Sequence, residues 1–410
     1  MKKTVTAVFD IGKTNKKFFL FDSEFQEVYR EYIQFDEITD EDGHPTEDLS
    51  ALRNWLKIVF DRILKTEKYD IKAINFSSYG ASLVHLDENR DVIFPMYNYT
   101  KSIPQDIIDR FYERYGPEED FHQKTGSSSS GMLNAGMQLY WLKITKPEIF
   151  KKIRYSLHLP QYLSFVFTGI PLSEYTSIGC HTSLWDFEKK DYHDWVYAEN
   201  LDQILPPIVS TETSINMNYN GKRIKIGVGI HDSSAALLPY VRSLRKQFIL
   251  ISTGTWSIAL NPFVKRTLSR KDVADDCINY MRINGKPVKS ARLFLGNEYS
   301  IQVKKLTEHY GVDKDYLSVL NNYKKKILER NKILKQTNYD INWIYHVENE
   351  IVDYGLKIYS RRIKHIKILN FEIKSLQTIN KDSPSFELAI NDNFTTNQET
   401  TKVDFKSKYL

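Results

Sequence analysis

Two segments far apart in this chain of 410 residues share one pattern: an apolar strand runs into a small polar turn and returns as a second strand. The first occupies residues 5–21 and turns at Gly12, and the second occupies residues 248–260 and turns at Gly254. A glycine at such a turn lets backbone N–H groups approach a ligand closely, and threonine hydroxyls add donors, so each hairpin can hold phosphate oxygens. Two such hairpins predict a nucleotide bound between two lobes.

Each hairpin also has a plainer interpretation, because a strand–turn–strand unit with a glycine is common in proteins that bind nothing there. The first turn imitates the end of a P-loop at residues 12–14. A P-loop needs a glycine where this chain has Ala7, and it opens a helix. Residues 16–21 carry aromatic side chains without a helical stripe, which excludes a P-loop here.

Length and composition favour two domains in a reducing compartment. A chain of 410 residues exceeds what one hydrophobic core normally supports. The formal charge of +5 is small for this length and arises from mixed signs, which argues against a nucleic-acid partner. The only cysteines are Cys180 and Cys277, and no motif pairs them, so a disulfide framework or a zinc site is not expected. We expect a cytoplasmic protein.

No membrane segment is expected either. The apolar run behind Lys2 and Lys3 breaks at Asp10, which makes it too short for the core of a signal peptide. No stretch approaches the roughly 20 apolar residues that are needed to cross a bilayer.

The first lobe is expected to occupy residues 1–225. Residues 49–64 place apolar side chains at the spacing of one buried helical face, and residues 71–76 follow as a buried strand. Strand, helix and strand in this order predict an α/β lobe. The polar residues 77–80 lie after that strand's carboxyl end, where such sheets usually bind ligands.

The second lobe is expected to open with a strand over residues 224–229 that delivers His231 and Asp232. Small residues then begin a helix, which places Asp232 at its N-terminus or cap. Two roles stay open for this aspartate and can coexist. It can cap the helix, since aspartate is a preferred cap residue, or it can act as a carboxylate base fixed at the mouth of a cleft.

Two further segments carry specific expectations. The glycine- and serine-rich residues 126–131 are expected to form a loop that enters a helix, with Ser130 as its cap. Residues 162–169 read as a helix closed by a glycine. The histidines and tryptophans between residues 181 and 195 have irregular spacing, which favours packed side chains over metal ligands.

Three motifs together resemble a known family. Residues 10–17, 229–236 and 252–257 resemble, in that order, three signatures of the FGGY carbohydrate kinases. That family belongs to the actin, hexokinase and Hsp70 ATPase superfamily. The chain looks most like its rhamnulokinase and fuculokinase branch, over about residues 1–320, including 173–182. The resemblance implies an α/β fold with two ribonuclease H-like lobes and a central cleft.

The resemblance also implies a reaction, in which an ATP-dependent kinase transfers the γ-phosphate to a hydroxyl of a ketose sugar. Asp232 matches the catalytic base of the family, and Asp10 would hold Mg²⁺ through water. Lys13 stands where the family usually has a threonine, and Lys17 matches a basic position. The residues expected to bind the ATP phosphates are Gly12, Lys13, Thr14, Asn15, Lys17, Thr253, Gly254 and Thr255.

The expected sugar site combines aromatic faces with hydrogen-bonding side chains. Ser82 stands where close relatives carry an acidic residue, and Asn98 and Tyr99 stand where they carry an arginine and an aspartate. A polar loop without a ligand is the alternative for each of these positions. The residues expected to contact the sugar are Tyr79, Ser82, Asn98, Tyr99, His231 and Asp232.

The chain departs from the family after about residue 320. Family members carry an Asp-Gly-Gly turn for adenosine there, but beyond residue 320 this chain has a single glycine, Gly355, and a single alanine, Ala389. Close approach to an adenine ring needs small residues. We therefore expect a partial C-terminal lobe over residues 226–320 and a divergent tail over 321–410, a truncated or frameshifted replacement of the missing half-lobe.

The tail is expected to be helical around residues 351–368 and disordered over 391–410. Its lysine-rich residues 322–335 are interpreted as a solvated helix face. These departures leave a second hypothesis open, a catalytically impaired kinase remnant that binds sugar or regulates a partner. The sequence also leaves a homodimer open.

Overall fold

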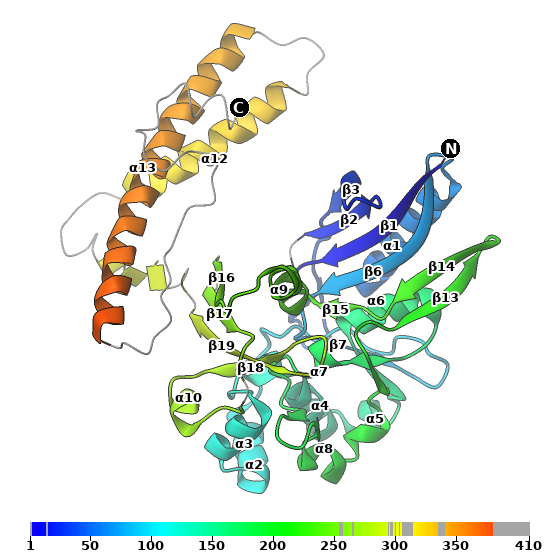
Figure 1. The fold of residues 1–410 in the computed structure, drawn as a ribbon. Helices are drawn as coiled ribbons and strands as arrows, with labels where there is room; N and C mark the ends of the chain where they lie inside the picture. The colour runs from blue at the N-terminus through cyan, green and yellow to red at the C-terminus, as the bar shows by residue number, and fades with distance from the viewer. Residues whose placement is uncertain are drawn as a thin grey trace. The chain divides into compact units, whose positions relative to one another are not determined.

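The computed structural model describes residues 2–13, 15–253, 257–264, 266–293, 295, 298–299, 301–302, 304–305, 315–334 and 341–379. The chain divides into two compact units, Met1–Asn297 and Glu298–Leu410. Figure 1 shows sheets with covering helices in the first unit and labels α12 and α13 in the second.

A seven-stranded mixed sheet forms the centre of the first unit, with the strand order β13-β14-β6-β1-β2-β3 and with β15 also paired to β6. β1, β14 and β15 run parallel to β6, whereas β2 runs antiparallel to both β1 and β3. Figure 1 shows β3 and the β13–β14 hairpin at opposite edges of this sheet. The strands are β1 (Lys3–Ile11), β2 (Lys16–Phe21), β3 (Glu27–Ile33), β6 (Tyr69–Ser78), β13 (Ser214–Tyr219), β14 (Lys222–Gly227) and β15 (Ile230–His231).

Two helices cover one face of this sheet, α1 (Leu49–Lys65) and α6 (Leu159–Thr168). The ring of Phe9 on β1 lies 5.5 Å from that of Trp55 on α1 and 6.1 Å from that of Phe167 on α6. α6 ends at Gly169 with a φ of 66°, a left-handed conformation that favours glycine. The predicted helices over 49–64 and 162–169 and the predicted strand over 71–76 are therefore confirmed.

The predicted helix cap at Ser130 is wrong. The glycine- and serine-rich loop enters a short 3₁₀ helix, η1 (Gly131–Leu133), and Ser130 makes no side-chain cap there. Its hydroxyl instead accepts a hydrogen bond from Nη2 of Arg292 at 2.9 Å, because the loop lies against the strand that carries this arginine. The helix α4 (Ala135–Thr145) begins only after Asn134.

A second core lies among the helices that follow, where Phe111, Tyr140 and Trp195 pack edge to face. This packing agrees with the structural interpretation of the tryptophans. The remaining elements of this region are α2 (Gln105–Tyr115), α3 (Glu118–Thr125), α5 (Pro147–Phe150), α7 (Tyr175–Ile178), α8 (Asp194–Ala198), η2 (Leu201–Gln203), and the short strands β4 (Ile38–Thr39), β5 (Pro45–Thr46), β7 (Leu83–Leu86), β8 (Tyr155–His158), β9 (Ser173–Glu174), β10 (Trp185–Asp186), β11 (Asp191–Tyr192) and β12 (Ile208–Val209).

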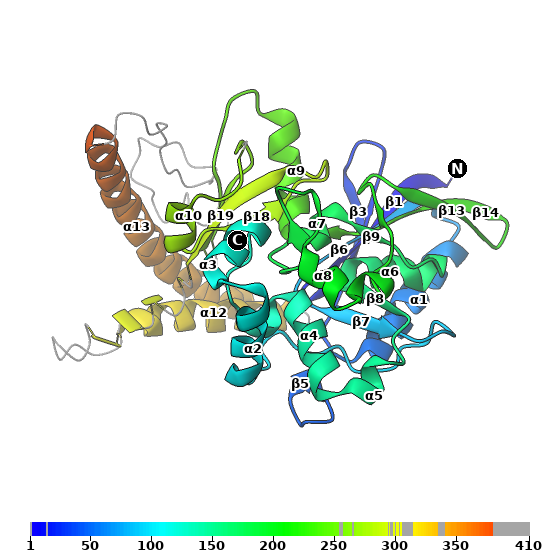
Figure 2. The same cartoon turned by 90° about the horizontal axis from the view of Figure 1, so that it is seen from below.

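The strand expected to open the second lobe belongs instead to the first sheet. β14 pairs in parallel with β6 through Lys225 and Ile226, because the buried isoleucine can complete the same core. A separate four-stranded sheet follows, in the order β16-β17-β19-β18. Figure 2 shows β18 and β19 of this sheet together with α10. Its elements and flanking helices are β16 (Leu250–Thr253), β17 (Ser257–Asn261), β18 (Ile278–Met281), β19 (Pro287–Leu293), α9 (Asp232–Ser243) and α10 (Arg270–Ala274).

The described residues of the second unit include a helical hairpin of α12 (Asp315–Ile333) and α13 (Ile341–Ile379). Ile333, Ile344 and Val347 belong to its small apolar core. Two ion pairs link the helices, Lys326 with Glu350 and Arg330 with Glu348, each at 2.9 Å. The predicted helix over 351–368 is confirmed, whereas residues 391–410 lie outside the described residues.

Candidate active site

Three parallel strands of the first sheet end side by side and position the candidate site. Asp10 of β1 lies opposite Ser77 of β6, which in turn lies opposite Ile230 of β15. One residue further on, the register aligns Ser78 with His231. Because the strands are parallel, the residues that leave their carboxyl ends gather at one edge of the sheet. Two segments more than 200 residues apart in the sequence therefore converge there.

The first hairpin turn is closed by a hydrogen bond from the backbone N–H of Gly12 to the carbonyl oxygen of Asn15, at 3.0 Å. Nζ of Lys17 lies 3.0 Å from Oδ2 of Asp10, and both side chains are about one-third exposed. Lys13 forms an ion pair with Glu37 at 2.7 Å. The turn thus keeps lysines beside the predicted phosphate site. Thr14 lies outside the described residues.

A buried ion pair that the sequence did not single out supports this turn. Nζ of Lys16 lies 2.9 Å from Oε2 of Glu47, with both side chains almost fully buried. The hydroxyl of Tyr79 donates to Oε1 of the same glutamate at 2.8 Å. Burial, together with the charge of Glu47, raises the pKa of Tyr79 well above its usual range, so the phenol stays protonated. Glu47 therefore ties the phosphate hairpin to the predicted sugar loop.

Asp232 is the first residue of α9, as expected, and His231 occupies the cap position. Oδ1 of Asp232 accepts hydrogen bonds from the backbone N–H of Ser233 at 2.6 Å and from its hydroxyl at 3.2 Å. The side chain of Asp232 remains 41% exposed. An anionic carboxylate at a helix N-terminus is stabilised by the helix dipole. Asp232 thus lies one residue past the cap position with a partly exposed carboxylate, and its role as a base stays a prediction.

The ring of His231 is buried behind Asp232. Its Nε2 lies 3.3 Å from Oδ1 of Asp232 and 3.3 Å from Sγ of Cys180. The ring of Tyr280 on β18 stacks on it with an interplanar angle of 13°. Burial lowers the pKa of His231, and the charge of Asp232 opposes that change. Burial also raises the pKa of the Cys180 thiol well above its usual range, so the cysteine is a packing group rather than a nucleophile.

The other predicted sugar contacts lie in different environments. The rings of Tyr79 and Tyr99 meet edge to face at 6.3 Å. Asn98 donates through Nδ2 to the carbonyl oxygen of Pro45 at 3.0 Å, and its Oδ1 accepts from the backbone N–H of Thr100. Ser82 is only 2% exposed. The amide of Asn98 is thus already satisfied by backbone groups.

The second hairpin forms as predicted up to its turn. β16 pairs antiparallel with β17, and Thr253 faces Ser257 at the end of the described strands. Thr253 is exposed. Gly254 and Thr255 lie outside the described residues.

The carboxylates near the first phosphate turn suit a Mg²⁺ ion that is held mainly by water and by the phosphates of a bound nucleotide. Among the described residues, no group of three or more histidine, cysteine, aspartate or glutamate side chains could hold a metal ion. Mg²⁺ in phosphoryl-transfer sites usually keeps several waters and takes one or two carboxylates plus substrate phosphates. The partly exposed carboxylate of Asp10, beside the first phosphate turn, fits that role.

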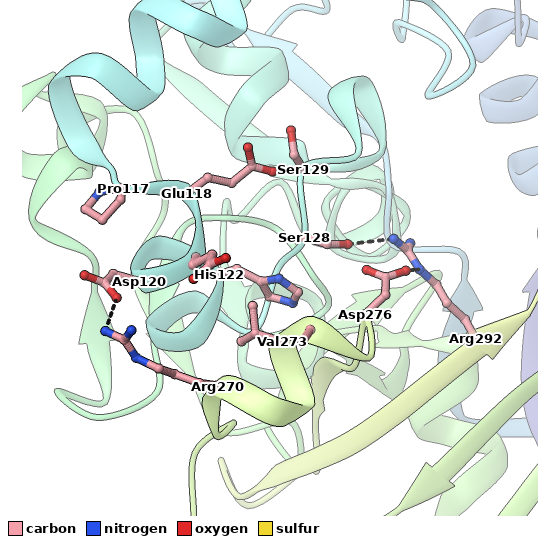
Figure 3. A pocket seen from close by; sticks show the side chains of 12 residues that line it. Pro117, Glu118, Asp120, His122, Ser128, Ser129, Arg270, Val273, Asp276 and Arg292 are labelled. Atoms are coloured by element: carbon pink, nitrogen blue, oxygen red, sulfur yellow. Dashed lines mark hydrogen bonds and ion pairs between the residues drawn. The ribbon is translucent and has the colours of Figure 1, made fainter.

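A separate cavity of about 730 Å³ lies between α3, the serine-rich loop, α10 and β19. Figure 3 shows Arg270 reaching Asp120 across one side and Arg292 reaching Ser128 and Asp276 on another. None of the predicted site residues lines this cavity. It is therefore distinct from the edge of the sheet that carries Asp10 and His231.

The fold is a mixed α/β fold shared with sugar kinases of the actin-like ATPase type, which confirms the predicted fold class. A crystal structure of a carbohydrate kinase from Novosphingobium aromaticivorans matches with a TM-score of 0.65 and 28% identity, over 74% of this chain and 66% of that chain. The sequence model of the FGGY family of carbohydrate kinases, N-terminal domain, matches residues 5–237, and that of the FGGY C-terminal domain matches residues 245–334. The chain therefore belongs to the FGGY family of carbohydrate kinases, as its motifs predicted.

Individual relatives match only parts of the chain. A rhamnulokinase of Oceanobacillus iheyensis is 23% identical over 252 residues, which cover 55% of this chain and 52% of that protein. The DNA replication and repair protein RecF of Acholeplasma laidlawii is 31% identical over 130 residues, which cover 30% of this chain and 37% of that protein. The chain spans about half the length of the rhamnulokinases it matches.

Among the described residues, every helix falls short of the length or the apolar character that a membrane span requires.

Proposed function

We propose that this protein is an ATP-dependent carbohydrate kinase that transfers the γ-phosphate of ATP to a hydroxyl of a ketose sugar. The observation that carries the proposal is the convergence of Asp10 and the His231–Asp232 pair at one edge of the sheet. A metal-binding carboxylate and a partly exposed base beside a phosphate turn are the groups that direct phosphoryl transfer needs.

Asp232 acts as the general base in this proposal. A hydroxyl oxygen of the sugar bonds to the γ-phosphorus while the bond from that phosphorus to the oxygen bridging it to the β-phosphate breaks, which releases ADP. The proton of the hydroxyl passes to Asp232, whose hydrogen bonds to Ser233 fix Oδ1 and whose side chain remains accessible. Asp10 would hold Mg²⁺ through water, and the ion would neutralise charge on the phosphates.

The first hairpin would bind phosphate through the backbone of Gly12 and the side chains of Lys13, Asn15 and Lys17. Thr14 of that hairpin, together with Thr253, Gly254 and Thr255 of the second, completes the proposed phosphate contacts. The neighbouring lysines support this assignment, because their charge attracts phosphate oxygens.

The proposed sugar site keeps the residues that the family resemblance implies, which are Tyr79, Ser82, Asn98, Tyr99, His231 and Asp232. Paired aromatic rings suit the apolar face of a sugar. The rhamnulokinase and xylulose kinase names of the relatives favour a ketose such as rhamnulose, fuculose or a pentulose.

The exposed edge of the second sheet favours a second candidate function, that of a kinase remnant without activity. β16 forms an edge of this sheet in the described part of the chain; Ile251 within it is 42% exposed and Ile249 just before it is 45% exposed. An exposed apolar edge strand is a ready template for pairing with another chain. We therefore keep the alternative of an impaired kinase remnant that binds sugar or regulates a partner.

The lobe boundaries near residues 225 and 320, the homodimer and the cytoplasmic location stay predictions. The division of the structure at residues 297 and 298 concerns compact units rather than the two lobes of a kinase.

The test is titration calorimetry with ATP and Mg²⁺, followed by a phosphoryl-transfer screen of ketoses with wild-type protein, Asp232→Asn and the exposed control Asp61→Asn. We expect turnover that is lost in Asp232→Asn and retained in Asp61→Asn. A folded protein that binds a ketose but transfers no phosphate would reject the kinase and favour the remnant.

A further inference from the structure

Glu174 is a carboxylate with no exposed surface, and it lies outside the predicted catalytic set. Its Oε2 accepts hydrogen bonds from the backbone N–H of Thr176 at 2.8 Å and from the hydroxyl of Thr211 at 2.6 Å. Its Oε1 accepts from the backbone N–H of Ser177 at 2.7 Å and from the hydroxyl of Thr176 at 2.7 Å. A buried charge is tolerated only when such donors replace water.

The hydroxyl of Thr176 links Glu174 to the candidate active site through a hydrogen bond with the backbone of His231. The backbone N–H of His231 donates to Oγ1 of Thr176 at 3.0 Å. A backbone N–H can only donate and a carboxylate can only accept, so the hydroxyl must accept from His231 and donate to Glu174. The direction of both hydrogen bonds is therefore fixed.

We propose that Glu174 and Thr176 are positioning residues for phosphoryl transfer, which hold the backbone at His231 so that Asp232 reaches the sugar hydroxyl. This inference rests on the proposed kinase function. Neither residue touches the proposed substrates. They act through the segment that carries the base.

The same segment is held from a second side. Nε2 of Gln161 lies 3.3 Å from the carbonyl oxygen of Gly229 and 3.5 Å from Oε1 of Glu174. Gly229 has a φ of 88°, and a Cβ there would lie 2.3 Å from the carbonyl oxygen of Pro160. The chain that enters β15 thus passes closely against α6. Through Gln161, Glu174 is also linked to the backbone of Gly229.

A carboxylate is required at position 174 rather than an amide. Each oxygen of Glu174 accepts a backbone N–H, one from Thr176 and one from Ser177. A glutamine would direct its NH₂ group at one of these donors in either orientation, so two donors would face each other. Glu174→Gln should therefore disturb α7 itself, which makes it a poor test of positioning alone.

Thr176→Val is the sharper test, with Thr176→Ser as its matched partner. Valine keeps the shape of threonine but removes the acceptor for His231, whereas serine keeps the hydroxyl. We expect kcat of Thr176→Val to fall by about 100-fold, as a small misplacement of a catalytic group can cause. The KM for the sugar should change much less, and Thr176→Ser should recover most of kcat.

Amide hydrogen exchange of residues 230–236, measured by mass spectrometry without substrates, separates this inference from the kinase proposal. We expect faster exchange there in Thr176→Val than in wild type or Thr176→Ser. Unchanged exchange, or faster exchange with an unchanged kcat, overturns the positioning role. A wild-type protein without turnover on any ketose rejects the kinase, and the exchange data then still decide whether Thr176 holds this segment.

Discussion

Lys17 and Asp10 face each other across the first hairpin, with Nζ of the lysine 3.0 Å from Oδ2 of the aspartate. Both side chains are about one-third exposed, so the pair adds less than about 1 kcal/mol to stability. We expect the pair to matter for nucleotide binding instead, because the positive charge of Lys17 holds the predicted Mg²⁺-binding carboxylate of Asp10 beside the phosphate turn.

Lys17→Met should therefore weaken binding of MgATP several-fold while the free energy of unfolding stays nearly constant. Lys3→Met is the matched control, since Lys3 also pairs with an aspartate of this hairpin, Asp22, at 2.8 Å but lies at the far end of β1. Titration calorimetry and urea unfolding measure the two quantities. Equal nucleotide affinity in both variants would remove Lys17 from the phosphate site.

Gly80→Ala should damage the candidate site through contact with His231. A Cβ at position 80 would lie 2.9 Å from Cδ2 of His231 and 3.3 Å from Sγ of Cys180. Since Tyr280 stacks on the ring of His231, the histidine cannot yield freely. We expect a loss of about 1–3 kcal/mol in unfolding free energy, as for other overpacked cores, and weaker sugar binding.

Thermal unfolding and ketose titration measure these two effects. A stable Gly80→Ala protein with wild-type sugar affinity would show that the ring of His231 does not contact the sugar.

The apolar and polar pattern of the sequence predicted the local position of each site residue within its own strand or helix. Asp10 at the end of a strand and Asp232 at the start of a helix follow from apolar runs that stop at polar residues. The pairing of strands does not follow, because any sheet can accept a strand such as 222–227. That is why the strand over 224–229 was expected to open the second lobe, whereas β14 pairs with β6 of the first sheet.

Contacts between distant residues were missed for the same reason. In the sequence, Lys16 resembles a surface residue because it lies beside other lysines. Its buried ion pair with Glu47 forms only in the folded protein. Thr176 and His231 are 55 residues apart, and nothing in the pattern of either segment indicates their hydrogen bond. The signal available in the sequence was a glutamate within an otherwise uncharged stretch, residues 173–182.

Stability should fall as the pH is lowered below 6.5. Burial lowers the pKa of His85 to about 4 and those of His158 and His181 to about 3, so these rings stay neutral in the folded protein. The unfolded chain takes up their protons below its ordinary pKa of 6.5. It then binds more protons than the folded state, and each histidine costs about 1.4 kcal/mol per pH unit across this window.

Urea unfolding followed by circular dichroism at pH 7, 6 and 5 measures this dependence. His158→Leu should reduce its slope by about one proton, because neither ring nitrogen of His158 has a hydrogen-bond partner and its charged form is excluded. An unchanged slope in this variant would mean that water reaches the ring.

Affinity for ATP should be far weaker than that of a rhamnulokinase such as the Oceanobacillus iheyensis relative. The first hairpin, which is predicted to bind phosphate, is formed by β1 and β2. Residues beyond 320 offer no Asp-Gly-Gly turn, and the described part of that region is a helical hairpin. Adenosine would then be held by few contacts, so most of the remaining affinity should come from the phosphates. Calorimetry with ATP and with tripolyphosphate, each with Mg²⁺, should accordingly give similar dissociation constants. Micromolar ATP binding that tripolyphosphate does not reproduce would show that the chain recognises adenosine by another route and would contradict the idea of an incomplete second lobe.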